Sequence, residues 1–428
     1  MSAIYKDKQI FSWALYDWAN SAYATVVIAG FFPVFFKEYW STGVDTGTST
    51  FYLGLSNSVS SLIIVLLAPL LGAIADQAGA RKGFLLFFAA LGMVMCGSLY
   101  FVQSGQWQLA VLLYIVASIG FMGGNIFYDA LITVVTKNEN MDRVSALGFS
   151  LGYLGGGVLF SINVLMVLYP ETFGLADSSE AIRLSFIMVA FWWMVFSLPL
   201  FLFVKETKNN NYKRKSVVSS IIKGVHQLTG TFHHVRRLRV VFLFLLAYWL
   251  YIDGVDTIIR MAVDYGMALG FPAQTLMVAL LITQFVGFPA ALLFGKLGET
   301  WGTKKGIFLA IFIYMGVTTY GYFMDQVYEF YVLAVVIGLV QGGVQSLSRS
   351  FYARIIPANK SAEFFGFYNM LGKFAAVLGP VMMGWVSMAT GEPRLSILSL
   401  LILFGFGALL LYFVNEEEGV RQAQFLQD

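Results

Sequence analysis

Charge, cysteine and histidine are all scarce in this chain of 428 residues. Only 12% of the residues are charged while 58% are hydrophobic, a balance that would leave a water-soluble protein with too little polar surface. The single cysteine, Cys96, excludes a disulfide framework or a cysteine metal site within one chain. The three histidines, His226, His233 and His234, lie outside the apolar runs, so metal-hydrolase chemistry has no ligand set inside a membrane. These shortages predict a membrane protein without cofactor or metal that is not an enzyme.

Long apolar runs are what the sequence has instead. A spanning helix needs about 20 apolar residues, and these runs are too long and too uniform for the alternating strands of a membrane barrel. The first run begins near Ile10 without a small-residue cleavage site, so we expect a spanning helix there and not a signal peptide. We predict an all-α integral membrane protein with twelve transmembrane helices at residues 10–36, 51–75, 83–103, 107–135, 144–168, 182–204, 238–263, 272–295, 306–324, 328–353, 363–389 and 394–414.

The basic residues predict the orientation of the chain. Because the number of spans is even, both termini lie on the same side of the membrane. Placing them in the cytoplasm leaves only Lys37, Arg183 and Arg394 in the outer loops. We therefore expect cytoplasmic termini, in the inner membrane of a bacterium or the vacuolar membrane of a eukaryote. The same distribution accounts for the net charge of +3, so a nucleic-acid partner is not implied.

The longest polar stretch divides the chain into two halves. We expect an N-terminal six-helix bundle over residues 1–204, a basic cytoplasmic linker over 205–237, and a C-terminal six-helix bundle with a short cytoplasmic tail over 238–428. Within the linker, apolar residues recur every three or four positions from Val218 to Val235, which suits a helix lying on anionic headgroups. A solvated basic connector fits the same segment equally well.

A short pattern occurs once in each half, after the second and the eighth predicted spans. The glycines let helix ends approach and turn, the acid can accept from the free amides of the next helix, and the cations stay on the cytoplasmic side. Such a duplication predicts a transporter built from two repeats around a central site, with these loops as gates. The matched sets, offset by 223 residues (295 minus 72), are Gly72, Asp76, Gly79, Arg81 and Lys82, and Gly295, Glu299, Gly302, Lys304 and Lys305.

Polar side chains inside the spans are confined to a few helices. Ionisable groups at that depth cost roughly 2.5 to 3.5 kcal/mol each on insertion scales, so their positions are informative. Asn125 and Asp129, for example, point within about 40° of each other on one helix. We expect such faces to line a shared aqueous interior, although static interhelical ion pairs and hydrogen bonds would give the same pattern. The residues are Asp17 and Asn20 in span one, Asn125 and Asp129 in span four, Asp253, Asp256 and Arg260 in span seven, Gln341, Gln345 and Arg349 in span ten, and Asn369 and Lys373 in span eleven.

Two parts of the sequence resemble a known family. The repeated loops look like the cytoplasmic loop signature of the major facilitator superfamily, with Gln77 and Thr300 where that signature commonly has arginine. The run WALYDWANSAY from Trp13 to Tyr23, with QSLSRS at 345–350, resembles the vacuole effluxer branch, the autophagy-related amino-acid effluxers and their bacterial relatives. The resemblance implies two six-helix bundles, with spans one, four, seven and ten around a cavity, and a monomer as the working unit. It also implies amino-acid release from the vacuole into the cytosol in eukaryotic members, a direction equivalent to inward in a bacterium.

We therefore expect a secondary active transporter that moves a small polar solute by alternating access. An amino acid or a similar zwitterion is the expected substrate, with protons as the candidate coupling ion. Asp17 and Asp129 are the candidates for proton binding, because the charge of a buried carboxylate depends on how open its site is to water. Arg349, at a similar depth, would modulate proton binding by these two carboxylates. We expect Arg260 or Lys373 to bind a carboxylate and Asp253 or Asp256 to bind an ammonium. Asp256 and Arg260, four residues apart, could also pair with each other. The other residues expected to line the cavity are Asn20, Tyr23, Asn125, Gln341 and Gln345.

Two other functions fit part of the sequence. Export of amphipathic compounds is an alternative that an aromatic content of 17% would tolerate. A membrane enzyme or a sensor without transport is disfavoured, because the predicted spans contain no histidine or metal-ligand cluster and no segment is long enough for a soluble catalytic domain.

Overall fold

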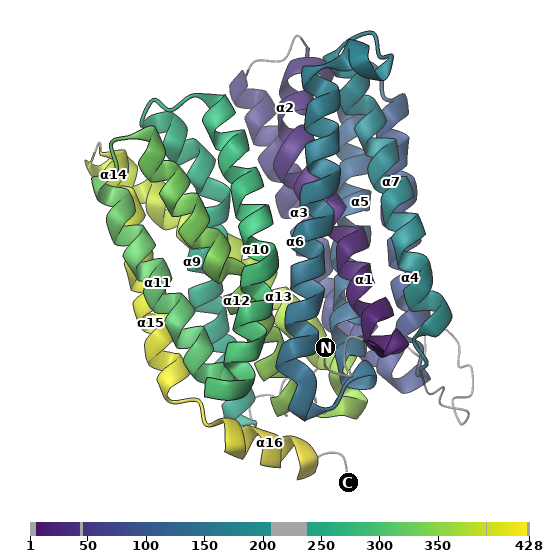
Figure 1. Cartoon of the computed structure of the whole chain (residues 1–428), viewed down its shortest axis with the longest axis vertical. Helices are drawn as coiled ribbons and strands as arrows, with labels where there is room; N and C mark the ends of the chain where they lie inside the picture. Colours follow the sequence, from purple (N-terminus) through teal and green to yellow (C-terminus); the bar gives the residue numbers. More distant parts are fainter. Residues whose placement is uncertain (1–5, 43–45, 207–237, 391, 426–428) are drawn as a thin grey trace.

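The chain folds into two bundles of long helices that lie side by side (Figure 1). The computed structural model describes residues 6–42, 46–206, 238–390 and 392–425. The N-terminal bundle contains α1 (Lys8–Ala22), α2 (Phe32–Phe35), α3 (Thr46–Ala78), α4 (Arg81–Ser98), α5 (Trp107–Val135), α6 (Met141–Leu168) and α7 (Ser178–Phe203). The C-terminal bundle contains α9 (Arg239–Ala268), α10 (Ala273–Trp301), α11 (Thr303–Phe323), α12 (Val327–Ile355), α13 (Ser361–Thr390), α14 (Pro393–Leu398) and α15 (Leu400–Tyr412), followed by α16 (Glu416–Phe425).

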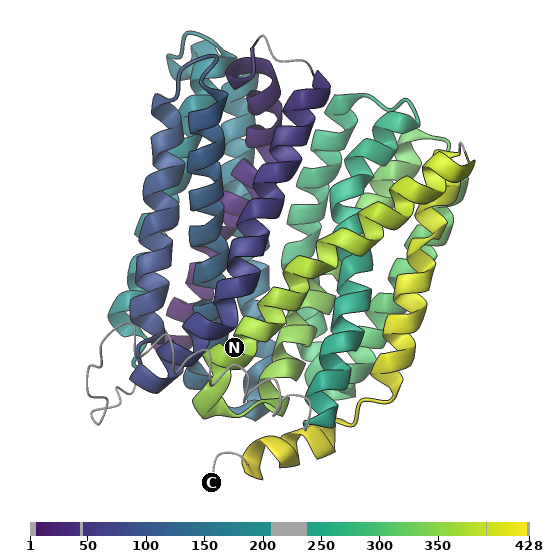
Figure 2. The same cartoon turned by 180° about the vertical axis from the view of Figure 1, so that it is seen from behind.

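The helices have the length and the composition of membrane spans. Eleven helices of the described part are long and apolar enough to cross a membrane. The 30-residue helix α13 takes the position of the eleventh predicted span and packs against α3 and α9. The predicted all-α fold of two six-helix bundles is confirmed, and the protein is a multi-pass membrane protein. Both termini lie at one end of the bundles, which we call the terminal end (Figures 1 and 2).

Three segments differ from the predicted spans or extend beyond them. The last span is divided into α14 and α15, and α16 forms where we predicted only a tail. The first span is not a uniform α-helix, because residues Tyr23–Phe31 form a π-helix between α1 and α2. The Phe32 amide donates to Val27, five residues back, and Pro33, which has no N–H, follows directly and interrupts the normal ladder. The predicted linker helix lies outside the described residues, which resume at residue 238.

Two glycines of the repeated pattern lie at close crossings between the bundles. A Cβ placed on Gly72 would overlap the carbonyl oxygen of Ala362, at the crossing of α3 and α13. A Cβ on Gly295 would overlap the Cβ of Ala146, at the crossing of α10 and α6. The two crossings are counterparts in the two halves, so the duplication seen in the sequence also organises the contact between the bundles.

The loops that follow these crossings are built alike, with one correction to their alignment. Gly79 (φ +58°) and Gly302 (φ +107°) both adopt backbone angles that favour glycine. The Lys82 ammonium donates to the carbonyls of Phe201 and Val204 at the end of α7, as Lys304 does at the end of α15. Lys82 therefore corresponds to Lys304, at an offset of 222 (304 minus 82), and not to Lys305. The second loop is one residue shorter, so both lysines are the second residue of their helices.

Replacing Gly72 by alanine should destabilise the protein, because the added methyl group has no room between α3 and α13. Overpacking of this kind costs about 1 to 3 kcal/mol, so the apparent Tm of the purified protein should fall. Gly83→Ala is the matched control, since a Cβ at Gly83, near the start of α4, meets nothing within 4 Å. Equal Tm values for the two variants would contradict the close crossing.

Candidate functional site

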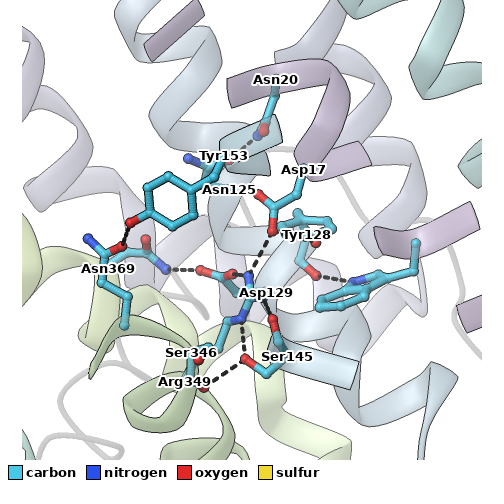
Figure 3. Close-up of polar contacts among 12 residues, drawn as sticks. Asp17, Asn20, Asn125, Tyr128, Asp129, Ser145, Tyr153, Ser346, Arg349 and Asn369 are labelled. Carbon is cyan, nitrogen blue, oxygen red and sulfur yellow. Dashed lines mark hydrogen bonds and ion pairs between the residues drawn. The ribbon is translucent and has the colours of Figure 1, made fainter. Parts of the chain in front are cut away.

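Arg349 of α12 reaches from the C-terminal bundle to two carboxylates of the N-terminal bundle (Figure 3). Its Nη1 atom lies 3.1 Å from Asp129 Oδ1 on α5 and 3.4 Å from Asp17 Oδ2 on α1. All three side chains are buried. We call Asp17, Asp129 and Arg349 the carboxylate–arginine cluster. Because its members come from both bundles, the cluster is a direct bridge between them.

The guanidinium is held further by α6. Arg349 Nε donates to Ser145 Oγ at 2.9 Å, and Nη2 donates to the Ser145 carbonyl at 2.8 Å. The same hydroxyl donates to the carbonyl of Ser346 on α12 at 2.7 Å. Ser145 therefore fixes the planar donor group of Arg349 from the N-terminal bundle, so that its remaining donors face the carboxylates.

Each carboxylate of the cluster has an additional donor. The Tyr128 hydroxyl donates to Asp17 Oδ2 at 2.9 Å, and Asn369 Nδ2 donates to Asp129 Oδ2 at 3.2 Å. Asn369 belongs to α13, so a second helix of the C-terminal bundle contacts the cluster. Buried charges persist only when they are paired and hydrogen-bonded, and this arrangement meets that requirement.

Aromatic rings enclose the guanidinium. The Arg349 Cζ atom lies 4.2 Å from the ring centre of Phe149, 5.0 Å from that of Trp13 and 5.5 Å from that of Tyr128. Trp13 also stacks on Tyr128, with ring centres 4.6 Å apart. Cation–π contacts are stronger when desolvated, so these rings add to the ion pairs in holding Arg349.

Gly148 on α6 leaves the space that the cluster fills. A Cβ at this position would lie 2.8 Å from both Asp17 Oδ2 and the Tyr128 hydroxyl, and 2.9 Å from Arg349 Nη2. We did not predict roles for Tyr128, Ser145 or Gly148 from the sequence. Span five contains Gly148, Gly152, Gly155, Gly156 and Gly157, and glycines at such positions permit close helix contacts.

The charges of the cluster do not balance. Two carboxylates and one guanidinium sum to −1 when all are ionised. Among the side chains that the structure describes, Arg349 is the only cation that pairs with Asp17 or Asp129. A proton on either carboxylate would make the cluster neutral and leave a single carboxylate–guanidinium pair between the bundles.

A layer of neutral polar groups lies beyond the cluster, further from the terminal end. Asn20 Nδ2 donates to Asn125 Oδ1 at 2.6 Å, and Tyr153 on α6 donates its hydroxyl proton to Gln345 Oε1 on α12 at 2.9 Å (Figure 3). The Tyr23 hydroxyl lies 3.0 Å from Ser118 Oγ, so Tyr23 faces the interior of the N-terminal bundle. Gln341, also buried, lies one turn from Gln345 on the same helix face.

Asp76, the first acid of the repeated pattern, contacts the opposite bundle. It accepts from the amides of Ala362 and Glu363 at the start of α13, at 3.1 and 2.8 Å, and pairs with Arg81 at 2.7 Å. The prediction that it accepts from the next helix is wrong. The first two amides of α4 donate to the Glu206 carboxylate instead, at 2.9 and 3.0 Å. The close crossing of α3 and α13 places Asp76 over the start of α13, whose free amides attract a carboxylate.

Glu299, the counterpart of Asp76, also contacts the opposite bundle, through an ion pair with Arg143 at the start of α6. Of the two departures from the loop signature, Thr300 makes no such contact in the described part. Thr300 donates to carbonyls of its own helix and is exposed, and the side chain of Gln77 lies outside the described residues.

Asp142 on α6 is a buried acid that we did not predict. It accepts from the hydroxyls of Thr303 (2.8 Å) and Ser350 and pairs with Arg354, all in the C-terminal bundle. Arg354 also pairs with Glu416 of α16 at 2.9 Å. The predicted span began at residue 144, so Asp142 was counted as a loop residue. Its carboxylate must leave this set of donors whenever the bundles separate at the terminal end.

Asp253 does not join the cluster, which corrects the expectation that it lines a shared aqueous interior. Its carboxylate is fully buried and accepts from the Gly379 amide of α13 at 3.0 Å and from Thr257 at 3.3 Å. Asp256 is half-buried on α9, and the side chains of Arg260 and Lys373 lie outside the described residues.

The polar contacts between the bundles are one-sided. In the described part of the chain, the hydrogen bonds and ion pairs that join them lie in the helix halves nearest the terminal end, from Tyr153–Gln345 to Arg143–Glu299. This conformation is therefore closed at the terminal end. The described residues include no group of three or more His, Cys, Asp or Glu side chains placed to hold a metal ion.

Comparisons with known sequences give consistent matches. The family described as "Vacuole effluxer Atg22 like" matches residues 41–424. An uncharacterized MFS-type transporter, YxiO, of Bacillus subtilis (strain 168) is 41% identical over 423 residues, covering 98% of each chain. Autophagy-related protein 22 of Yarrowia lipolytica is 24% identical over 479 residues, covering 92% of this chain and 80% of that protein.

Solved structures match along nearly the whole chain. The proton:xylose symporter XylE of the major facilitator superfamily aligns with a TM-score of 0.74, covering 100% of both chains at 13% identity. The superfamily transporter FucP, in its outward conformation, aligns with a TM-score of 0.70, covering 95% of this chain and 99% of that one, also at 13% identity. At this identity the likeness shows the fold alone, which is the major facilitator fold.

Replacing Arg349 by glutamine should destabilise the protein far more than replacing Asp129 by asparagine. The first change leaves two buried carboxylates without a cation, and breaking a buried pair costs about 3 to 5 kcal/mol. The second change removes the surplus negative charge. We expect a large fall in apparent Tm for Arg349→Gln, a small one for Asp129→Asn, and partial recovery when Arg349→Gln is combined with Asp17→Asn. Equal decreases in apparent Tm for the two single variants would contradict the net charge of −1 assigned to the cluster.

Proposed function

The chain belongs to the Atg22-like vacuole effluxer family of the major facilitator superfamily, and from that membership we propose that it carries an amino acid or similar small zwitterion by alternating access. The protein is a membrane transporter and not an enzyme. We further propose that transport is coupled to protons. The observation that carries the coupling is the buried pair of carboxylates, Asp17 and Asp129, that shares one guanidinium between the bundles.

The coupling follows from where the charges are attached. Asp17 and Asp129 move with the N-terminal bundle, and Arg349 moves with the C-terminal bundle. Opening the terminal end separates opposite charges and exposes them to water. A proton on one carboxylate removes one of the two attractions, so protonation lowers the cost of opening. Because a ligand shifts a conformational equilibrium only through its different affinity for the two states, the proton must bind more tightly when the terminal end is open.

We place the substrate in the neutral layer next to the cluster. Asn20, Asn125 and Gln345 come from the helices of spans one, four and ten and carry donors and acceptors without net charge. Such groups suit a solute whose own charges cancel. We assign the charged ends of the zwitterion to Asp256 for the ammonium and to Arg260 or Lys373 for the carboxylate. Gln341 and Tyr23 complete this set.

The terminal end is assigned to the cytoplasm. Lys82 and Lys304 lie there, as the distribution of basic loop residues requires. The closed conformation then faces outward, and the loops around Asp76 and Glu299 are its cytoplasmic gates. We propose inward transport of the solute, in the cytoplasmic membrane of a bacterium, by a monomer.

Export of amphipathic compounds is the less favoured function. The more enclosed of two apolar cavities in the C-terminal bundle, lined by Ile258, Tyr265, Thr283, Phe330 and Leu333 among others, has a volume of about 80 Å³. The other, of about 490 Å³, is an open hollow along α10, lined by Val278, Phe285 and Leu293 among others. Pockets that enclose drug-sized molecules have roughly 300 to 1,000 Å³, several times the volume of the enclosed cavity. Ligand-induced Tm shifts, measured for the twenty standard L-amino acids and for a series of hydrophobic cations, separate the two functions.

Neutralising either carboxylate should uncouple transport from the pH gradient. In proteoliposomes loaded at pH 7.5, lowering the external pH to about 6 should stimulate amino-acid uptake by the unmodified protein, because protons then enter with the solute. Asp17→Asn and Asp129→Asn should lose this stimulation and keep solute exchange at equal pH, which needs no net proton movement.

The matched control is Asp325→Asn, which changes an exposed carboxylate paired with Arg394 far from the cluster. It should keep the stimulation. If both Asp17→Asn and Asp129→Asn take up solute with the full response to the gradient, the proton-coupling assignment is wrong.

A further inference from the structure

Tyr153 belongs to the N-terminal bundle, but its ring packs into the C-terminal bundle. Tyr153 is a residue of α6, yet its ring lies between two glycines of the C-terminal bundle, Gly287 on α10 and Gly342 on α12. A Cβ at Gly342 would lie 2.8 Å from Tyr153 Cε2, and a Cβ at Gly287 would lie 3.0 Å from Tyr153 Cγ. Both distances are shorter than ordinary carbon contacts. The absence of side chains at these two positions therefore creates the slot that the ring fills.

The Tyr153 hydroxyl orients the side-chain amide of Gln345 on α12. It donates to Gln345 Oε1 at 2.9 Å, and Tyr153 as a whole is only 8% exposed (Figure 3). A glutamine amide has one oxygen acceptor and two N–H donors on nitrogen. With the oxygen engaged by Tyr153, the amide cannot flip without losing that bond, and its nitrogen remains as the donor side.

The geometry points to Tyr153 as a positioning residue for the solute: it holds Gln345 so that the amide N–H groups can donate to the carboxylate of a zwitterion. This assignment rests on the proposed function and adds to it the residue that makes recognition depend on conformation. Tyr153 travels with the N-terminal bundle and Gln345 with the C-terminal bundle. When the terminal end opens, the ring leaves its slot and Gln345 loses the bond that orients it.

The consequence is a difference in affinity between the two states of the transporter. A free glutamine side chain samples many rotamers, so a donor that must first be ordered binds a carboxylate more weakly. The solute should bind more tightly when the terminal end is closed and be released more easily when it is open. Alternating access requires a difference of this kind, since a solute with equal affinity for both states would not shift the equilibrium between them.

The test compares three variants in proteoliposomes, using whichever of the twenty standard L-amino acids the unmodified protein takes up fastest. Tyr153→Phe keeps the ring in the slot and removes only the hydroxyl. It should raise KM about five- to tenfold, the effect of one lost hydrogen bond and its ordering, and leave the maximal rate within about twofold. Gly342→Ala should raise KM similarly, because the new methyl group on α12 occupies part of the slot and displaces the Tyr153 ring, which moves its hydroxyl away from Gln345.

Tyr251→Phe is the matched control. It also removes a buried tyrosine hydroxyl that bonds to α12, at 2.7 Å from Ser348, but this bond lies within the C-terminal bundle and joins no moving parts. Its KM should equal that of the unmodified protein. The primary amine with the same side chain but no carboxylate, measured as an inhibitor of uptake, should bind equally well to the unmodified protein and to Tyr153→Phe.

The outcomes separate the assignment from the function on which it rests. An unchanged KM in Tyr153→Phe, in a protein that does take up amino acids, overturns the role of Tyr153 alone. The same KM increase for Tyr251→Phe also overturns it, because the effect would then follow from any lost tyrosine bond to α12. Failure of the unmodified protein to take up any of the twenty amino acids overturns the proposed substrate and this assignment with it.

Discussion

Charge buried between two movable bodies in a membrane is the constraint on which the rest of this structure depends. Lipid offers neither water nor counterions, so Asp17 and Asp129 must find a cation within the protein, and Arg349 must find anions. The partners lie on opposite bundles, which makes the ion pairs part of the contact that closes the terminal end. Ser145 and the surrounding aromatic rings then hold the guanidinium in place, and Tyr128 also donates a hydrogen bond to Asp17.

The duplicated sequence explains how the rest of the closure is built. Gly72 and Gly295 allow each bundle to approach the other at equivalent crossings, and each is followed by an acid, Asp76 or Glu299, that binds the start of a helix in the opposite bundle. The central cluster breaks this symmetry, since both of its acids belong to the N-terminal half. With two acids on one bundle and one guanidinium on the other, protonation of one acid leaves a single ion pair between the bundles, and this is the basis of the proposed response to protons.

The spans and the depth of the polar residues could be predicted because lipid imposes length and apolar composition locally. Pairing could not, because Asp17 and Arg349 are 332 residues apart and meet only through the docking of the bundles. Helix-face arithmetic gives a direction around an axis but not the neighbour found there, so Asp253 was expected in the cavity and lies against the α13 backbone. Tyr153 and Asp142 carry no local signal, because a slot between glycines or a set of hydroxyl donors exists only after folding.

The central claim is that the carboxylate–arginine cluster holds the terminal end closed, and distances across that end test it most directly. Spin labels on Asn138 and Ala358, in a Cys96→Ala background, report on a cavity that Asn138 lines from the N-terminal bundle and Ala358 from the C-terminal bundle. A variant with Asp17→Asn, Asp129→Asn and Arg349→Gln removes the attraction without leaving buried charge. The account predicts a shift of this pair to longer distances in the neutral variant, with no shift for labels on Lys305 and Glu417 within one bundle. An unchanged Asn138–Ala358 distribution would contradict it.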